Sequence, residues 1–448
     1  MADARGRDDA PGDEARAAPE AAGVQLTAAT RWLSTSSPGF LWPALVGTVF
    51  LVLAFLIVGP MVGAPLGAHD DHELPVIAGQ LRTEGFLPTL ASWLDEGRGR
   101  FRPGYWVLRV SETAIWGLDT RGWYLDRAAL LLASLWAGYL LARLRFAPAV
   151  SLLAAALLVA GPQAESFGRL GPQEAYAVPL SLAGFALIGR RREAPGLLLL
   201  VLSAFIKEPF IPLAFLGVAW AWARDRRGAA VLAGLVLGIA LAGALAQVLA
   251  GGHLAGQVRN PSTIAWTALE LAAVMAVATG WPLAIIADNR RWLALIAAAI
   301  VLPQVFILAD LNVAQRYLYP AVFAGILCAA AAAARSRIAY VLVAAILVAG
   351  VGRQALATNN RLAATRSFAS FVAMLGALDL PIVIHTEGTV VTEQAIAIRR
   401  YLPSARISLV PPVTSKSDVF DPYVPGRCVE ADVDVPAAGL CATAYPVP

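Results

Sequence analysis

Long apolar stretches separated by short polar connections form the dominant pattern of the chain from residue 39 onward. Residues 228–250 and residues 292–309 contain no charged side chain. Because a helix needs about 20 apolar residues to cross the hydrocarbon core of a bilayer, such stretches predict membrane spans. We predict eleven spanning or half-spanning helices, over 39–60, 122–142, 147–161, 174–189, 196–206, 209–222, 228–250, 264–287, 292–310, 316–334 and 337–357.

The connections between these helices differ in charge between the two sides of the membrane. With the N-terminus in the cytoplasm, each cytoplasmic connection contains at least two arginines, which is the usual bias of cytoplasmic loops. These connections are 143–145, 190–192, 224–227, 289–291 and 335–337. The outer side then receives 61–121, 162–173, 207–208, 251–263, 311–315 and the tail from 358 onward.

The segment 196–222 has arginine-rich flanks at both ends, so both ends are expected on the cytoplasmic side. One straight helix of this length would measure about 40 Å and end on the opposite side. Pro209 cannot continue a regular helix, because its ring clashes with the preceding turn. We therefore predict two short helices that meet at a charged turn, Lys207-Glu208, on the outer side. Helices too short for a straight span also leave room for a cavity open to that side.

Two regions outside the apolar helices have patterns of their own. In the outer loop 61–121, the amphipathic stretch 102–118 is predicted to lie flat on the membrane surface, where Trp and Tyr are favoured. In the tail, alternating apolar residues predict strands over 382–385 and 407–410, with a helix over 392–401 between them. This pattern indicates a small α/β domain ending in a Pro-rich irregular segment.

Composition supports a multi-pass membrane protein. Hydrophobic residues make up 58% of the 448 residues and charged residues 15%, against about 25% charged residues in soluble domains. The formal charge of +4 comes largely from the short connections and does not indicate a nucleic-acid partner. We expect a disordered cytoplasmic tail over 1–37, a transmembrane domain over 38–357 and an extracytoplasmic domain over 358–448. The first apolar run begins too late for an ordinary signal peptide and is expected to be the first anchor.

The acidic side chains that could carry chemistry all fall on the predicted outer side. Asp70 and Asp71 could serve as a general base or bind a divalent cation, or could belong to a solvated loop with a helix N-cap. Glu174 could act in the site or favour the dipole of the helix that it begins. The pair Lys207 and Glu208 favours a polar cavity, because charge at membrane depth is costly.

The cationic candidates fall on the same side. Arg316 and Tyr317 open a predicted helix, where Arg could bind phosphate oxygens in bidentate fashion or both side chains could anchor the interface. Arg169 and Gln173 form one candidate cluster with Glu174 at the predicted outer end of helix 174–189, and Arg259 is a weaker candidate for binding an anion. One outer cavity with acids and cations suits a phosphate-bearing donor and a hydroxyl acceptor.

Six segments, in order along the chain, resemble motifs of the GT-C class of membrane glycosyltransferases. The resemblance is to the branch that contains the protein O-mannosyltransferases and lipid A aminoarabinose transferase, and it runs from about residue 40 to residue 335. In this sequence Asp71 stands where the family has Glu, Glu174 stands where it has Asp, and Gln173 is an insertion or a shift. The segments are Asp70-Asp71 with Ala78 and Gly85, 102–106, 127–143, 167–174, 202–209 and 316–320.

The resemblance implies a GT-C fold: an all-α polytopic membrane protein of about eleven transmembrane helices, here with the small C-terminal α/β extracytoplasmic domain. It implies an inverting glycosyltransferase in the bacterial cytoplasmic membrane. The sugar would pass from a polyprenyl-phosphate donor to a lipid, glycan or protein acceptor on the outer face. The implied catalytic residues are Asp70, Asp71 and Glu174, with Asp71 also the candidate ligand for a divalent cation. The implied substrate-binding residues are Arg102, Tyr105, Arg169, Lys207, Glu208, Arg259, Arg316 and Tyr317.

Two other classes of function fit part of the pattern. A transporter or flippase for a polyprenyl-linked glycan would explain the apolar helices and the charged residues among them. It would not explain an outer loop of about sixty residues with an acidic pair, and it predicts broken helices in two matching halves. A non-catalytic protein that binds a lipid-linked sugar is the third reading, against which the retained Asp70 counts.

Overall fold

The computed structural model describes residues 41–67, 71, 73–96, 102–222, 226–249, 319–377, 381–385, 389–410, 421, 427–432 and 442–446. The predicted tail 1–37 and the predicted helices 264–287 and 292–310 lie outside these residues. The described part is mostly helical. Its apolar helices are α2 (Leu41–Val58), α6 (Thr120–Ala142), α7 (Pro148–Ala156), α8 (Glu174–Gly189), α9 (Glu193–Ile206), α10 (Ile211–Trp222), α11 (Arg227–Leu249), α15 (Tyr319–Arg335) and α16 (Arg337–Ala377).

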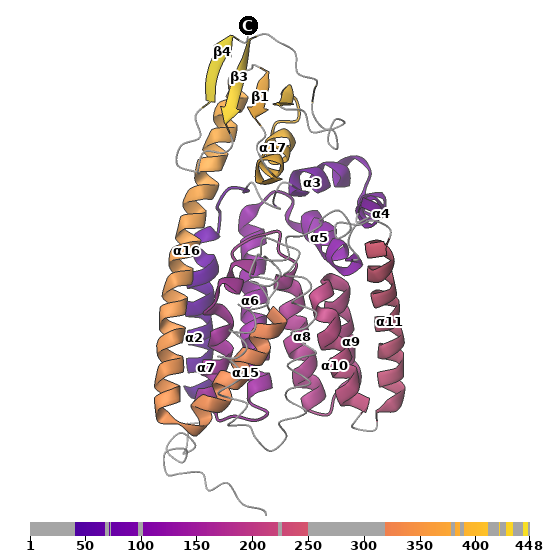
Figure 1. The fold of residues 1–448 in the computed structure, drawn as a ribbon, viewed down its shortest axis with the longest axis vertical. Helices are drawn as coiled ribbons and strands as arrows, with labels where there is room; N and C mark the ends of the chain where they lie inside the picture. The colour runs from indigo at the N-terminus through magenta and orange to yellow at the C-terminus, as the bar shows by residue number, and fades with distance from the viewer. Residues whose placement is uncertain are drawn as a thin grey trace, which may run out of the picture.

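These helices form a bundle, and the remaining elements lie at one end of it (Figure 1). Within the described residues, three helical segments are long and apolar enough to cross a membrane: Leu41–Met61, Thr120–Ala142 and Arg337–Ala377. Six shorter apolar segments accompany them. Phe55 on α2 is 71% exposed and Ile338 on α16 is 74% exposed. Large apolar side chains on the outside of a bundle indicate contact with lipid.

The break predicted at Pro209 is confirmed. Helix α9 ends at Ile206, and Lys207 has an extended backbone with φ −152° and ψ 127°. The 3-10 turn η4 (Glu208–Phe210) follows, and α10 starts at Ile211. Helices α9 and α10 then lie against each other (Figure 1). Further 3-10 turns are η1 (Gly59–Met61), η2 (Leu157–Val159) and η3 (Pro162–Ser166).

The described part of 61–121, the segment predicted as an outer loop, contains three helices: α3 (Glu73–Thr83), α4 (Phe86–Glu96) and α5 (Pro103–Trp116). Only α5 corresponds to the amphipathic stretch predicted over 102–118. It starts with a proline at its first position, where the missing N–H costs nothing, and it is capped by Gly117, whose φ is +54°. Helices α3 and α4 were not predicted; each is only 11 residues long, and their apolar side chains pack with those of α5.

Helix α16 is longer than predicted. The last apolar helix was predicted to end at residue 357, but α16 continues unbroken to Ala377. Its 41 residues span about 60 Å at 1.5 Å per residue, roughly twice the hydrocarbon thickness of a bilayer. The prediction was wrong because the sequence becomes polar after residue 357, at Thr358-Asn359-Asn360-Arg361, whereas a helix that leaves the membrane requires only its own backbone hydrogen bonds. Figure 1 shows α16 passing along the whole bundle to the strands.

The C-terminal strands form one four-stranded sheet of order β2-β1-β3-β4. Strand β1 is parallel to β2 and β3, and β3 is antiparallel to β4. The predicted strands are confirmed as β1 (Ile382–His385) and β2 (Ile407–Val410), and the predicted helix as α17 (Thr389–Tyr401). The Pro-rich end is not wholly irregular, because it contains β3 (Arg427–Asp432) and β4 (Ala442–Pro446). Strand β3 contains charged residues and pairs with β1, and β4 pairs only with β3. Local sequence does not reveal this pairing.

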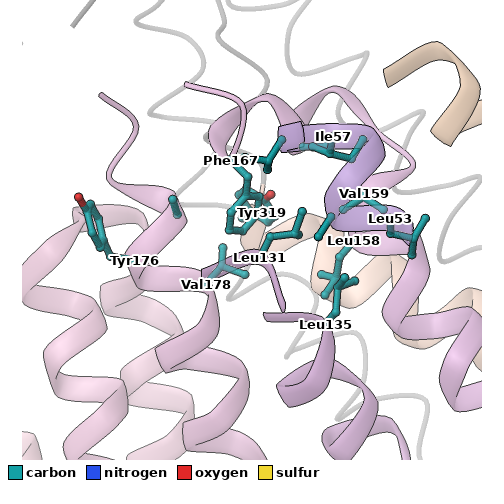
Figure 2. Packing of buried hydrophobic residues seen from close by; sticks show 14 of the residues in the cluster. Leu53, Ile57, Leu131, Leu135, Leu158, Val159, Phe167, Tyr176, Val178 and Tyr319 are labelled. Atoms are coloured by element: carbon teal, nitrogen blue, oxygen red, sulfur yellow. The ribbon is translucent and has the colours of Figure 1, made fainter. Parts of the chain in front are cut away.

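Two apolar cores stabilise these parts. In the C-terminal part, Phe368 and Phe371 from the last turns of α16 pack with Ile384 of β1 and Ile398 of α17. Residues beyond 357 therefore belong to the core under the sheet. In the bundle, Figure 2 shows side chains from α2, α6, η2 and the segments around α8 and α15 pointing toward one another. These are Leu53, Ile57, Leu131, Leu135, Leu158, Val159, Phe167, Val178 and Tyr319.

Candidate functional site

Two close backbone contacts pack α9 against α8 and α5. A Cβ on Gly184 of α8 would lie 2.9 Å from the carbonyl oxygen of Gly196 on α9, so these two helices touch through glycines. A Cβ on Gly104 of α5 would lie 3.1 Å from the carbonyl oxygen of Phe205. Small residues allow this approach of backbones. The second contact holds the end of α9, and with it the charged turn, against the first turn of α5.

Five side chains meet at this junction and are named here the Arg102–Lys207 cluster: Arg102, Gln173, Glu174, Lys207 and Glu208. Arg102 Nε donates to both carboxylate oxygens of Glu208, at 2.9 and 3.0 Å. The Gln173 amide oxygen accepts from Arg102 Nη1 at 3.1 Å and from Lys207 Nζ at 2.8 Å. Lys207 Nζ also lies 3.6 Å from Glu174 Oε1. Two cations therefore converge on one amide oxygen.

Burial divides this cluster into an outer and an inner part. The side chains of Arg102 and Glu208 are 10% and 25% exposed, whereas those of Lys207 and Glu174 are each 1% exposed. Neither oxygen of Glu174 accepts a hydrogen bond from any residue that the structure describes. A buried carboxyl group is costly unless it is paired, and the ion pair with Lys207 offsets this cost for Glu174. An anionic ligand entering from outside would reach Arg102 first.

A second network fixes the loop that carries Gln173. The Leu170 carbonyl oxygen accepts from Arg109 Nη1 and from Arg127 Nη2, each at 2.7 Å. Arg127 Nη2 is also 2.7 Å from the Tyr176 hydroxyl oxygen, and that hydroxyl donates to a Glu112 carboxylate oxygen. Both arginines are fully buried. Charge-assisted bonds to one carbonyl restrain the loop, which explains why Gln173 can stand between Arg102 and Lys207.

Tyr105 joins this network to the start of α3. Its hydroxyl donates to the Gly171 carbonyl oxygen at 3.3 Å and lies 3.4 Å from Glu73 Oε2. The side chain is only 2% exposed. The same Glu73 oxygen is 3.9 Å from Arg109 Nε. In this geometry Tyr105, predicted to bind substrate, supports the loop before α8.

The remaining predicted residues within the described range lie at two neighbouring places. Asp71 is 5% exposed and accepts the Gly67 backbone N–H at 2.8 Å through Oδ2, just before α3. Arg169 Nη1 lies 3.9 Å from Glu165, and Arg361 Nη2 of α16 donates to the same carboxylate at 3.2 Å. The ion pair of Arg169 is thus with Glu165 and not with Glu174, its neighbour in the predicted cluster.

Four of the predicted site residues, Asp70, Arg259, Arg316 and Tyr317, lie outside the described residues. Their roles stay predictions. Among the residues that the structure does describe, no three His, Cys, Asp or Glu side chains gather as ligands of a metal would.

The sequence did not point to Arg109, Arg127 and Tyr176 as parts of the site. A signal existed for Arg127, because a single arginine inside an apolar helix is costly and usually has a specific partner. Gln173 was predicted in one cluster with Arg169 and Glu174, but only the packing of three elements shows that its amide oxygen joins Arg102 to Lys207.

The Glu112 carboxyl group makes stability depend on pH. Burial raises its pKa to about 7, and the nearby Asp126 adds to the rise against the opposing charge of Arg127. The folded protein therefore retains a proton that the unfolded chain releases. The contribution of Glu112 to the free energy of unfolding is greatest below about pH 4.5 and falls as pH rises toward 7. The fall is on the order of 3 kcal/mol, at about 1.4 kcal/mol per pKa unit.

We expect Glu112→Gln to remove this pH dependence, because the amide still accepts from Tyr176 but does not ionise. Thermal unfolding in detergent between pH 4.5 and 8 measures the effect. The difference in stability between variant and wild type should shift in favour of the variant as pH rises. A difference in stability between variant and wild type that stays constant from pH 4.5 to 8 would contradict the assignment of the pKa shift to Glu112.

Comparison with known proteins shows the fold. No protein-family model matches the chain, and no curated protein is detectably similar in sequence. The structure of ArnT from Cupriavidus metallidurans in the apo state is similar, with a TM-score of 0.53 and 13% identity, covering 89% of this chain and 94% of that chain. A second ArnT structure, bound to undecaprenyl phosphate, gives a TM-score of 0.47 and 13% identity over 87% and 93%.

ArnT is lipid A aminoarabinose transferase, a GT-C protein. The resemblance of the sequence to that branch of the GT-C class is therefore confirmed at the level of the fold. The bundle described above is a GT-C membrane fold.

Proposed function

We propose that the chain is an inverting glycosyltransferase that moves a sugar from a polyprenyl-phosphate donor to an acceptor hydroxyl on the outer face of the cytoplasmic membrane. The observation that carries the proposal is the convergence of Arg102 and Lys207 on one amide oxygen, beside the buried acid Glu174. A fold similar to that of ArnT and helices that expose large apolar side chains add support. The acceptor class, lipid, glycan or protein, stays open.

The donor phosphate is assigned to the Arg102–Lys207 cluster. Arg binds phosphate oxygens through a planar fork of donors, and Lys adds a compact charge. Both carboxylate oxygens of Glu208 accept from Arg102, as two oxygens of a phosphate would. The incoming phosphate displaces Glu208 from Arg102, and Lys207 approaches its oxygens from the buried side. Arg259, Arg316 and Tyr317 are further candidates for the same phosphate.

The reaction follows from these assignments. The acceptor hydroxyl attacks the anomeric carbon of the sugar from the face opposite the phosphate and loses its proton to Asp70, the general base. The bond between the anomeric carbon and the phosphate oxygen breaks, and its electron pair stays on the phosphate. Arg102 and Lys207 offset the charge that develops there. Glu174 positions the loop before α8 or contacts the acceptor, and Arg169 lies within the same outer region.

We expect Glu208→Gln to strengthen the binding of undecaprenyl phosphate by about tenfold and Arg102→Met to weaken it by at least as much. Removing the Glu208 charge leaves Arg102 available to the phosphate, whereas losing Arg102 removes a charge-assisted hydrogen bond of about 1.5–3 kcal/mol. Titration of the purified protein in detergent with undecaprenyl phosphate measures both dissociation constants.

The matched control is Arg226→Met, which removes an exposed arginine that pairs with Glu193 away from the cluster and should leave the dissociation constant unchanged. Equal affinities for wild type, Glu208→Gln and Arg102→Met would remove the cluster as the phosphate site. A loss of affinity in Glu208→Gln equal to that in Arg102→Met would show that Glu208 supports Arg102 and does not compete for it.

A further inference from the structure

The C-terminal helix α17 reaches the loop that precedes α3. Tyr401, its last residue, donates a hydrogen bond from its hydroxyl to the Gly67 carbonyl oxygen at 2.7 Å. Helix α17 also packs against α3, and Figure 1 shows the two helices next to each other. Tyr401 and Gly67 are 334 positions apart in the sequence. The C-terminal part is thus joined directly to the loop that contains Asp71.

Gly67 connects Tyr401 to the carboxylate of Asp71. The Gly67 N–H donates to Asp71 Oδ2 at 2.8 Å, while the Gly67 carbonyl accepts from Tyr401. The surroundings leave little space at this residue. A Cβ on Gly67 would lie 3.2 Å from Asp71 Oδ2 and 3.8 Å from Thr365 Oγ1 of α16. Gly67 is therefore held by two hydrogen bonds, one to Asp71 in its own loop and one from Tyr401 of α17.

Tyr401 is itself held in place by the core under the sheet. Its ring meets the ring of Phe368 edge to face, with centroids 6.0 Å apart, and Phe368 is a buried member of that core. Burial raises the pKa of the Tyr401 hydroxyl, and the negative charge of Asp71 raises it further. The hydroxyl therefore stays protonated and remains a donor to Gly67.

We propose that Tyr401 is a positioning residue through which the C-terminal α/β unit holds the Gly67 backbone, and with it the Asp71 carboxylate, in the geometry needed for transfer. The role in transfer rests on the proposed function, whereas the hydrogen-bonded chain from Tyr401 to Asp71 does not. The C-terminal α/β unit then contributes to the function of the site, although it lies far along the sequence from the Arg102–Lys207 cluster.

Tyr401→Phe tests this role, because it keeps the ring against Phe368 and removes only the hydroxyl. We expect the Gly67 amide proton to exchange with deuterium about five- to tenfold faster, as the loss of one neutral hydrogen bond implies. In the transfer assay, kcat should fall about tenfold while KM for the donor stays unchanged. A merely structural role would not separate kcat from KM in this way.

The control is Tyr139→Phe, which removes a hydroxyl that accepts from Trp42 Nε1 at 2.9 Å within the bundle. It should alter neither Gly67 exchange nor kcat. As a second variant, Gly67→Ala places a methyl group against Asp71 with Tyr401 intact and should lower kcat similarly.

Unchanged Gly67 exchange in Tyr401→Phe would overturn the inference whatever the activity of the protein. Faster exchange with unchanged kcat in an active wild type would overturn the positioning role. A wild type that transfers no sugar would remove the proposed function and the role in transfer together, and the exchange data would still decide whether Tyr401 holds the loop.

Discussion

Asp70→Asn is expected to lower the rate of sugar transfer by about 10²–10⁴-fold, the usual contribution of a general base. The amide keeps the size and shape of the carboxyl group but cannot take the proton of the acceptor hydroxyl. Donor affinity should not change, because the phosphate is assigned to Arg102 and Lys207. The measurement is transfer from a labelled polyprenyl-phosphate sugar in proteoliposomes, together with the dissociation constant of undecaprenyl phosphate.

Asp71→Asn is the matched control for this prediction. Its side chain still offers an oxygen to the Gly67 N–H, so the loop should remain in place. We expect a smaller loss of transfer, caused by removal of a negative charge next to the base. Transfer at the wild-type rate in Asp70→Asn would remove Asp70 as the base. A larger loss in Asp71→Asn would move that assignment to Asp71.

Lys207→Met is expected to abolish transfer and to destabilise the protein by about 3–5 kcal/mol, the cost of breaking a buried ion pair from one side. Lys207 and Glu174 are each 1% exposed and 3.6 Å apart. Without the lysine, the Glu174 carboxylate is left buried without a countercharge. Thermal unfolding in detergent and the proteoliposome transfer assay measure the two effects separately.

The double variant Lys207→Met with Glu174→Gln separates folding from function. Because it removes both buried charges, it should recover most of the lost stability. Transfer should stay at the level of the single variant, since the donor phosphate still lacks Lys207. Recovery of transfer together with stability would show that Lys207 acts only as the partner of Glu174.

The sequence was sufficient to predict features that follow from local physics. Apolar length and the arginine-rich connections predicted α8 and the break between α9 and α10. The break could be placed because Pro209 cannot continue a helix and because charge at membrane depth needs a polar environment. The two strands and the helix of the tail could be predicted because the spacing of apolar residues changes from one to the next. The motifs around Arg102 and Lys207 pointed to residues that the fold brings together.

Other features depend on long-range packing and left no local signal. Helix α16 extends beyond its apolar part because Phe368 and Phe371 pack under a sheet formed later in the chain. Gln173 is central because Gly104 and Gly184 allow α5, α8 and α9 to approach closely. Arg169 was grouped with Glu174 by proximity in sequence, but in the fold it pairs with Glu165 of η3, which also pairs with Arg361 of α16.

The central claim is that the protein cleaves the bond between a sugar and a polyprenyl phosphate. The most direct measurement uses wild-type proteoliposomes and a donor with one label on the sugar and a second label on the phosphorus. We expect polyprenyl phosphate to be released in equal amount to the sugar transferred, and Asp70→Asn to lower both by the same factor. Movement of the intact donor across the bilayer with both labels still joined, and without release, would contradict the account and indicate transport.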